Sequence, residues 1–233
     1  MKNSIILSDI SLVYDLNKKF KNTLKKNIIN TLIDKNIYNE KIFALKKINL
    51  KIEENSVVGL YGPNGSGKTS LLKILAKITD PTEGSLEVPY NSNFIGSTDF
   101  NFIDDATGEE NTKLFLKLKK IKDSEINEKI QNIFEISKIG NFFYQPVKIY
   151  SSGMKMRLAF ASTQMIKSDL LLMDEWISAA DQSMREYIYT TIHDKIESSK
   201  ITIIASHNHE ILKSNCSQII YLKNGEIENI KSV

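Results

Sequence analysis

The chain has 233 residues, 41% of them apolar, and a formal net charge of +3, so it can bury the core of one domain and carries too little charge to argue for nucleic-acid binding. No apolar run reaches the roughly 18 residues that a membrane-spanning helix requires, and the first residues lack the charged start and long apolar stretch of a secretory signal. The single cysteine, Cys216, excludes an internal disulfide bond and fits a reducing compartment.

Two predicted strands at the start of the chain enclose an insertion of different composition. The strands cover residues 5–14 and 48–61, which are rich in apolar and β-branched residues. Between them, residues 17–43 place apolar side chains at every fourth position and crowd five lysines at one end, namely Lys18, Lys19, Lys21, Lys25 and Lys26. Such a basic amphipathic helix suits a membrane surface or a lipid-linked diphosphate, but it also suits a surface helix that packs its apolar stripe on the domain.

The next segment fits the pattern G-x-x-x-x-G-K-[ST] at every fixed position. It lies between a buried strand at 57–61 and a helix that begins at Ser70, and it consists of Gly62, Pro63, Asn64, Gly65, Ser66, Gly67, Lys68 and Thr69. Glycines let the backbone turn its N–H groups inward, and the helix points its positive end at the same place. We expect Lys68 to neutralise the β and γ phosphates of a nucleotide and the Thr69 hydroxyl to ligate Mg²⁺. The segment therefore predicts a phosphate loop, with Ser70 as its last contact.

The pattern becomes helical from about residue 100 to 165, after a turn at 80–84 and a short strand near Leu86. Two apolar faces are predicted at helical spacing, the first from Leu114, Leu118 and Ile121 and the second from Ile126, Ile130 and Ile133. A Ser-x-Gly turn then opens a further helix, with Ser151, Ser152, Gly153 and Met154 at its start. This turn predicts a second phosphate-contacting surface, displaced from the first.

Residues 170–174 form an apolar run that suits a parallel strand buried on both faces, and two carboxylates emerge at its end. Ligands of open α/β sheets bind at the carboxyl ends of the strands. We expect Asp174 to hold the metal through its water shell and Glu175 to act as the general base that polarises the attacking water.

The remainder alternates helix and strand, with a helix at 181–196 and strands at 201–205 and 218–222. His207 follows the strand at 201–205, where an imidazole can reach a γ-phosphate and sense its presence. His209 is a rival two residues further on, and His193 lies in a polar helical stretch that suggests no role.

The order of these motifs resembles the nucleotide-binding subunit of an ABC transporter over nearly the whole chain. Three motifs narrow the resemblance. Tyr150 to Met154 is similar to the Tyr-Ser-Ser-Gly-Met form found in exporters of bacterial polysaccharides, O antigens, capsules and teichoic acids. Asp174 to Asp181 resembles the Asp-Glu-Trp-Leu-Ser-x-x-Asp of that group, and Thr107 to Asn111 resembles its Thr-Gly-Arg-Glu-Asn, with Glu109 in place of arginine.

The resemblance implies an α/β fold of the P-loop NTPase class, in which residues 1–233 form a single ABC nucleotide-binding domain. Its parts would be a RecA-like core, an antiparallel β subdomain and an inserted helical subdomain. Two copies would sandwich ATP, so that residues 151–154 contact the γ-phosphate held by the phosphate loop of the other copy. Asp181 would belong to the loop that links the two sites. Tyr14 sits where the family places an aromatic ring that stacks on adenine, although it would also suit a strand edge.

One departure concerns the glutamine that such transporters usually carry after the strand that leads into the helical subdomain. The stretch 93–102 contains no glutamine, which leaves Ser97, Thr98 and Asp99 as candidates for the metal-contacting and coupling residue.

By this resemblance, the chain is expected to be the ATP-hydrolysing motor of a bacterial ABC exporter that moves a lipid-linked polysaccharide. Its expected partners are a second copy of itself, a separate transmembrane permease and the lipid-linked glycan cargo, with no nucleic acid. It would sit on the cytoplasmic face of the inner membrane through the permease. The alternatives are a soluble ABC ATPase that acts on ribosomes or DNA, and a protein that binds ATP without turnover.

Overall fold

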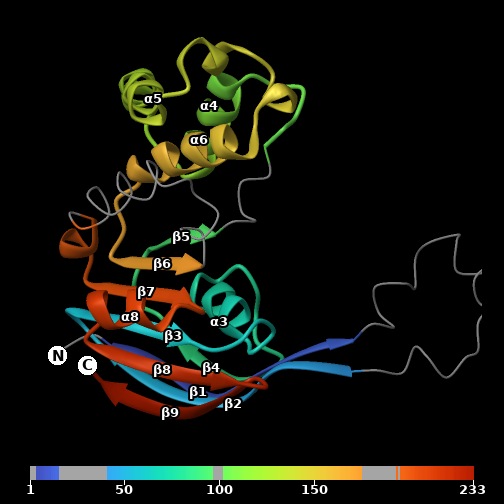
Figure 1. Cartoon of the computed structure of the whole chain (residues 1–233), viewed down its shortest axis with the longest axis vertical. Coiled ribbons are helices and arrows are strands. Elements are labelled where there is room, and N and C mark those ends of the chain that lie inside the picture. The colour runs from blue at the N-terminus through green and yellow to red at the C-terminus, as the bar shows by residue number, and fades with distance from the viewer. Residues whose placement is uncertain (1–3, 16–40, 97–101, 175–192, 194) are drawn as a thin grey trace, which may run out of the picture.

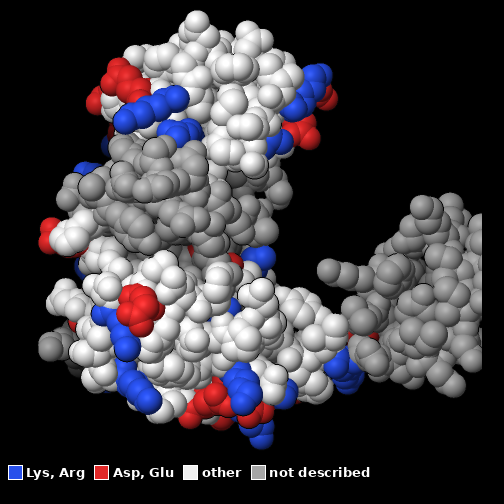
Figure 2. Space-filling model, viewed as in Figure 1, with Lys and Arg blue, Asp and Glu red and all other residues white. Residues whose placement is uncertain are grey.

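The computed structural model describes residues 4–15, 41–96, 102–174, 193 and 195–233. In this part of the chain a lobe of helices stands above a body built on two sheets, as Figure 1 shows. On the face drawn in Figure 2, basic and acidic side chains are interspersed over both parts, as the nearly balanced totals of 31 and 28 lead one to expect.

The smaller sheet is antiparallel and has the strand order β2-β1-β4. It comprises β1 (Ser4–Asp15), β2 (Lys41–Glu53) and β4 (Glu83–Glu87). The pairing of β1 with β2 runs from Ser4 opposite Glu53 to Asp15 opposite Lys41. Residues 41–43 therefore belong to a strand and not to the insertion predicted at 17–43. Residues 16–40, which include the five lysines of the predicted basic helix, lie outside the described residues.

The larger sheet has the order β5-β6-β7-β3-β8-β9 and is parallel except for its last strand. Its strands are β3 (Ser56–Tyr61), β5 (Ser92–Gly96), β6 (Leu170–Asp174), β7 (Ile201–Ser206), β8 (Gln218–Lys223) and β9 (Glu226–Ser232). The strand predicted at 48–61 is divided by a turn at Asn55, which adopts a φ of 61°. The helix α3 (Lys68–Leu75) contacts β6 and β7, and the helix α8 (His209–Asn215) contacts β3 and β7.

Every residue of β6 is buried, and this agrees with the prediction of a parallel strand covered on both faces. The main core lies where the smaller sheet and α3 meet the larger sheet, and it includes Ile5, Leu12, Leu60 and Leu71. Each such side chain contributes about 1.5–3 kcal/mol when it is fully removed from water. The buried core holds β3, β6 and β7 in place, and the predicted site residues lie at the carboxyl ends of these strands.

A helical lobe lies within the region predicted as a helical subdomain, about 100–165. Its elements are α4 (Gly108–Leu118), α5 (Asp123–Ser137), the short 3₁₀ helices η2 (Gly140–Tyr144) and η3 (Val147–Ile149), and α6 (Ser152–Gln164). The lobe has a core of its own, which includes Leu116, Ile126, Phe143 and Leu158. Among the described residues, no helix is both long and apolar enough to cross a membrane.

The first apolar face predicted in this lobe is wrong for Leu114 and Leu118, although its third member, Ile121, packs against the core of the lobe. Leu114 and Leu118 are 41% and 72% exposed, whereas Leu116 between them is fully buried. The buried face of α4 consists instead of Gly108, Asn111, Thr112 and Leu116, so two polar residues set it. The second predicted face is correct, because Ile126 and Ile133 are buried and Ile130 packs against the same core.

Candidate functional site

The phosphate loop joins the end of β3 to the start of α3, and two of its glycines have no substitute. A Cβ atom on Gly62 would lie 2.2 Å from the carbonyl oxygen of Leu222. Gly67 caps α3 with a φ of 107°, in the left-handed region that side chains disfavour. Gly65 also has a positive φ, of 80°, but its Cβ position faces open space, so a phosphate can approach the backbone there.

Lys68 is buried beneath this loop at the first position of α3. Its ammonium group donates hydrogen bonds to the carbonyl oxygens of Gly62 (2.7 Å) and Pro63 (3.1 Å). Within the described residues no side chain caps the start of α3, so the helix presents its positive end to whatever binds the loop. Pro63, Asn64 and Thr69 are exposed at the rim. The arrangement suits an anion above the loop, with Lys68 as its counter-charge.

The carboxyl ends of three strands bring the other predicted residues to the same edge. Asp174, the last residue of β6, is buried and lies opposite Ala205 of β7, which in turn lies opposite Leu60 of β3. The phosphate loop begins two residues after Leu60, and the spacing of strands places β6 about 10 Å from β3. A carboxylate at this edge and the exposed Thr69 hydroxyl are hard oxygen donors of the kind that Mg²⁺ prefers.

His207 follows β7 directly and is exposed at the edge where Ser206 pairs with Tyr61. Its rival His209 is engaged elsewhere, because its Nε2 lies 2.7 Å from the Tyr221 hydroxyl and its ring packs edge-on against Tyr61. The position of His207 at the strand end agrees with the prediction, and its role as a phosphate sensor stays a prediction. His193 is exposed and pairs with Glu197, four residues further along the chain, at 3.5 Å.

Tyr14 lies near the phosphate loop by the register of the smaller sheet. It pairs with Ile42, and one step along the ladder Val13 pairs with Phe43. The neighbouring residue Ala44 reaches the loop, since a Cβ on Gly67 would meet its carbonyl oxygen at 2.7 Å. Tyr14 is 38% exposed as a residue, so it is not a buried filler of the strand edge. Its stacking on adenine stays a prediction.

The Ser-x-Gly turn stands on the helical lobe, apart from the phosphate loop (Figure 1). Ser151 caps α6 by accepting a hydrogen bond from the backbone N–H of Met154 at 3.2 Å. Ser151 and Ser152 are exposed, and a Cβ on Gly153 would meet only the Ser151 hydroxyl, at 3.9 Å. An uncrowded helix start of this kind can receive a phosphate from outside the chain.

The motif at 107–111 has a structural role that the sequence did not reveal. The Thr107 hydroxyl accepts from the Glu110 N–H at 3.1 Å, and the Glu110 carboxylate accepts from the Thr107 N–H at 2.8 Å, a reciprocal cap that starts α4. Asn111 accepts from the Ile103 N–H at 2.8 Å and donates to the carbonyl oxygens of Ile103, Ala106 and Thr107. The signal that indicates such a cap is a threonine followed three residues later by a glutamate, as in Thr107 and Glu110. Glu109, the departure from the related motif, is exposed.

Gly108 connects this motif to the Ser-x-Gly turn. A Cβ there would lie 2.3 Å from the Tyr150 hydroxyl, which donates a 2.6 Å hydrogen bond to the carbonyl oxygen of Phe142. Burial raises the pKa of Tyr150 above its ordinary value. Because Ser151 follows Tyr150, the packing of Tyr150 beneath the start of α4 determines where the turn stands.

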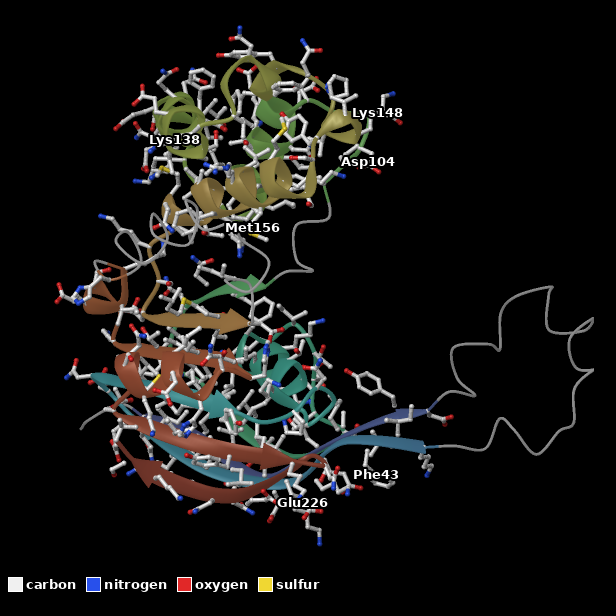
Figure 3. All side chains as sticks on the ribbon, viewed as in Figure 1. Phe43, Asp104, Lys138, Lys148, Met156 and Glu226 are labelled. Carbon is white, nitrogen blue, oxygen red and sulfur yellow. The ribbon has the colours of Figure 1, made fainter. Side chains whose placement is uncertain are left out.

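Two exposed ion pairs border the same turn. Lys155 of α6 lies 3.1 Å from Asp104, and Lys148 lies 2.9 Å from Asp105, whose pKa is lowered mainly by that hydrogen bond. Figure 3 shows Asp104 and Lys148 together on one side of the lobe and Met156 on the side of α6 nearer the sheets. Exposed pairs of this kind contribute at most about 1 kcal/mol.

Several predicted residues lie outside the described part of the chain. They are the general base Glu175, the loop residue Asp181, and the glutamine replacements Ser97, Thr98 and Asp99. The structure thus brings the phosphate loop, Asp174 and His207 to one edge and leaves the base untested.

The family described as "ABC transporter" matches residues 45–178. The relatives that the chain resembles include three proteins named "Teichoic acids export ATP-binding protein TagH". The protein of Listeria innocua is 31% identical over 97% of this chain and 66% of its own length, and that of Bacillus anthracis is 35% identical over 80% and 34%. The protein of Staphylococcus haemolyticus is 30% identical over 98% of this chain and 84% of its own length. The chain thus spans less than two thirds of the first two.

Solved structures support the fold. "Dimeric structure of a post-hydrolysis state of the ATP-binding cassette MJ0796 bound to ADP and Pi" superposes with a TM-score of 0.75 at 23% identity, covering 98% of both chains. "Dimeric Structure of MJ0796, a Bacterial ABC Transporter Cassette" gives 0.74 at 24% identity, with the same coverage. The expected ATP-binding-cassette fold is thereby confirmed.

Proposed function

We infer the function from one established premise, that the chain belongs to the ABC transporter family. We propose that it is the ATP-hydrolysing motor subunit of a bacterial exporter that moves a lipid-linked polysaccharide of the teichoic acid type across the cytoplasmic membrane. The observation that carries the proposal is the similarity to relatives named as teichoic acids export ATP-binding proteins, which reaches 97–98% of this chain in two of them.

The proposed ATP hydrolysis would use residues at the carboxyl ends of β3, β6 and β7. The phosphate loop would hold the β and γ phosphates of ATP, with the buried Lys68 turning from the loop carbonyls towards them. Thr69 and, through water, Asp174 would hold Mg²⁺, which when bound neutralises charge that develops on the phosphates. Glu175 would accept a proton from the attacking water, and His207 would contact the γ-phosphate.

We propose that two copies complete each site. The Ser-x-Gly turn stands on the helical lobe, whereas the phosphate loop belongs to the sheet body, so one chain presents them on separate surfaces (Figure 1). Head-to-tail pairing would place Ser151 and the Gly153 N–H of one copy against the γ-phosphate held by the other, giving two equivalent sites by two-fold symmetry. Both related cassette structures are described as dimeric.

The proposed partner in the membrane is a separate permease on whose cytoplasmic side this subunit sits. Closure of the ATP-bound pair would be transmitted to the permease through the helical lobe, and hydrolysis would reopen it. The names of the relatives support the proposed cargo, and they favour export over a soluble ATPase that acts on ribosomes or DNA.

The test is ATP turnover by the purified chain. Lys68→Ala should weaken nucleotide binding by at least about tenfold because the loop loses its counter-charge. Glu175→Gln should still bind ATP while hydrolysis falls by about 10²–10⁴. Lys73→Ala, further along α3, is the matched control and should change neither. Near-normal turnover by Glu175→Gln would remove the base assignment, and ribosome- or DNA-stimulated turnover would favour the soluble alternative.

A further inference from the structure

A buried lysine lies at the joint between the helical lobe and the larger sheet. Lys195 is only 9% exposed, and its ammonium group donates to three carbonyl oxygens at the end of α6. The acceptors are Thr163 at 2.7 Å, Ile166 at 3.0 Å and Gln164 at 3.4 Å. An ammonium group has three donors, so these bonds use its whole capacity.

The arrangement solves a problem that every helix end poses. The last carbonyl oxygens of a helix have no partner within it, and the helix dipole makes that end negative. A cation at that end donates hydrogen bonds to the unpartnered carbonyl oxygens and also neutralises the negative end of the helix dipole. Burial lowers the pKa of Lys195 to about 8, so keeping the charge here costs desolvation, and the three bonds offset only part of that cost.

Other donors hold the same helix end from two sides. Asn93 of β5 is fully buried and donates to the Thr163 carbonyl at 3.3 Å, from the sheet. Lys129 of α5 donates to the Met165 carbonyl at 3.4 Å, from within the lobe. Lys195 belongs to the helical residues 195–198 just before β7. It therefore connects the end of α6 to the strand that leads to His207.

We propose that Lys195 is a positioning residue for the composite ATP site, which holds the end of α6 on the sheet so that its start, at Ser151 and Gly153, meets the nucleotide of the second copy. This inference rests on the proposed function. With 13 residues, α6 is about 20 Å long. A tilt of about 10° at the joint would move its start by about 3 Å, far beyond the few tenths of an ångström that a hydrogen bond tolerates.

A positioning role and a merely stabilising role make different predictions. The phosphate loop lies on the sheet body, so loss of Lys195 should leave nucleotide binding by one copy nearly unchanged. Pairing of two copies depends on where α6 starts, so it should weaken. A general loss of stability would instead weaken both nucleotide binding by one copy and the pairing of two copies.

The experiment measures ATP-driven dimerisation by sedimentation in a Glu175→Gln background, with nucleotide affinity measured separately at protein concentrations below pairing. Lys195→Met should weaken dimerisation at least about tenfold, as expected for loss of charge-assisted hydrogen bonds, with nucleotide affinity within about twofold. Lys195→Arg, which keeps the charge, should recover most of the pairing. The matched control is Lys200→Met, since Lys200 is exposed and forms a surface ion pair with Asp169 at 3.4 Å.

Dimerisation of Lys195→Met equal to that of its parent would overturn the inference while leaving the proposed function intact. A parent that shows no ATP-dependent pairing would overturn the proposed function and the inference with it. Circular dichroism establishes that each variant is folded. If Lys195→Met does not fold, Lys195→Gln decides, because it keeps a donor without the charge, and unchanged pairing in that variant would also overturn the inference.

Discussion

Gly108→Ala should destabilise the helical lobe through a single clash. The added Cβ would lie 2.3 Å from the Tyr150 hydroxyl and 2.9 Å from the carbonyl oxygen of Phe143. Relief requires Tyr150 to move, which breaks its 2.6 Å hydrogen bond to Phe142. Overpacking costs about 1–3 kcal/mol and the lost bond about 1 kcal/mol, whereas alanine gains about 0.5–1 kcal/mol over glycine in a helix. The net loss in the free energy of unfolding is therefore about 1–3 kcal/mol.

The assay is urea unfolding followed by circular dichroism, carried out as a double-mutant cycle with Tyr150→Phe. The phenylalanine lacks the oxygen that the new methyl group meets, so Gly108→Ala should cost at least about 1 kcal/mol less in that background. Some cost should persist, because the contact with the Phe143 carbonyl does not depend on Tyr150.

Gly153→Ala is the matched control within the same lobe. Its Cβ would meet only the Ser151 hydroxyl, at 3.9 Å, so stability should hold or rise by about 0.5–1 kcal/mol. Strict additivity of Gly108→Ala and Tyr150→Phe, or an equal loss in Gly153→Ala, would refute the packing account of this motif.

Two further predictions concern Tyr14 and Lys195. Tyr14→Ala should weaken ATP binding by about 3- to 30-fold, as loss of one aromatic stack predicts, while Tyr14→Phe should bind normally in a fluorescence titration, and full affinity of the alanine variant would remove the adenine role. Burial lowers the pKa of Lys195 to about 8 from 10.5, so between those values the unfolded chain holds a proton that the folded chain has lost. The free energy of unfolding should therefore rise with pH across this window, by at most about 1.4 kcal/mol per pH unit, and Lys195→Met should lack that rise. Parallel pH profiles of the two proteins would contradict a buried, titrating Lys195.

The sequence predicted best those parts in which chemistry requires fixed residues at fixed spacing. The phosphate loop needs glycine where Gly62 approaches the Leu222 carbonyl and where Gly67 has a positive φ. Its motif can therefore be recognised from the sequence alone. Asp174 and His207 were predicted at one edge because parallel strands align their carboxyl ends there. The pairing of β6, β7 and β3 bears out that alignment.

The sequence predicted worst those features that depend on distant parts of the chain. Apolar periodicity selected Leu114 and Leu118, whereas the buried face of α4 includes the polar residues Asn111 and Thr112, and the Asn111 amide bonds the loop before the helix. Lys195 lies in a polar stretch that suggests exposure, yet the end of α6, some thirty residues earlier, buries it. The periodicity of a single segment does not show which distant residues it will contact.

The start of β2 shows a third such failure. Ile42 and Phe43 suit a strand as well as an amphipathic helix, and they pair with β1, which extends to Asp15. The pairing with the partner strand decides the boundary of the insertion.

The most direct test of the central claim uses the native bacterium with a chromosomal Glu175→Gln substitution. Surface glycan is compared with lipid-linked glycan retained inside the cell, and a Lys73→Ala strain serves as control. The proposed export motor predicts loss of surface glycan together with intracellular accumulation of the lipid-linked precursor. Normal surface glycan with no accumulation inside would contradict it.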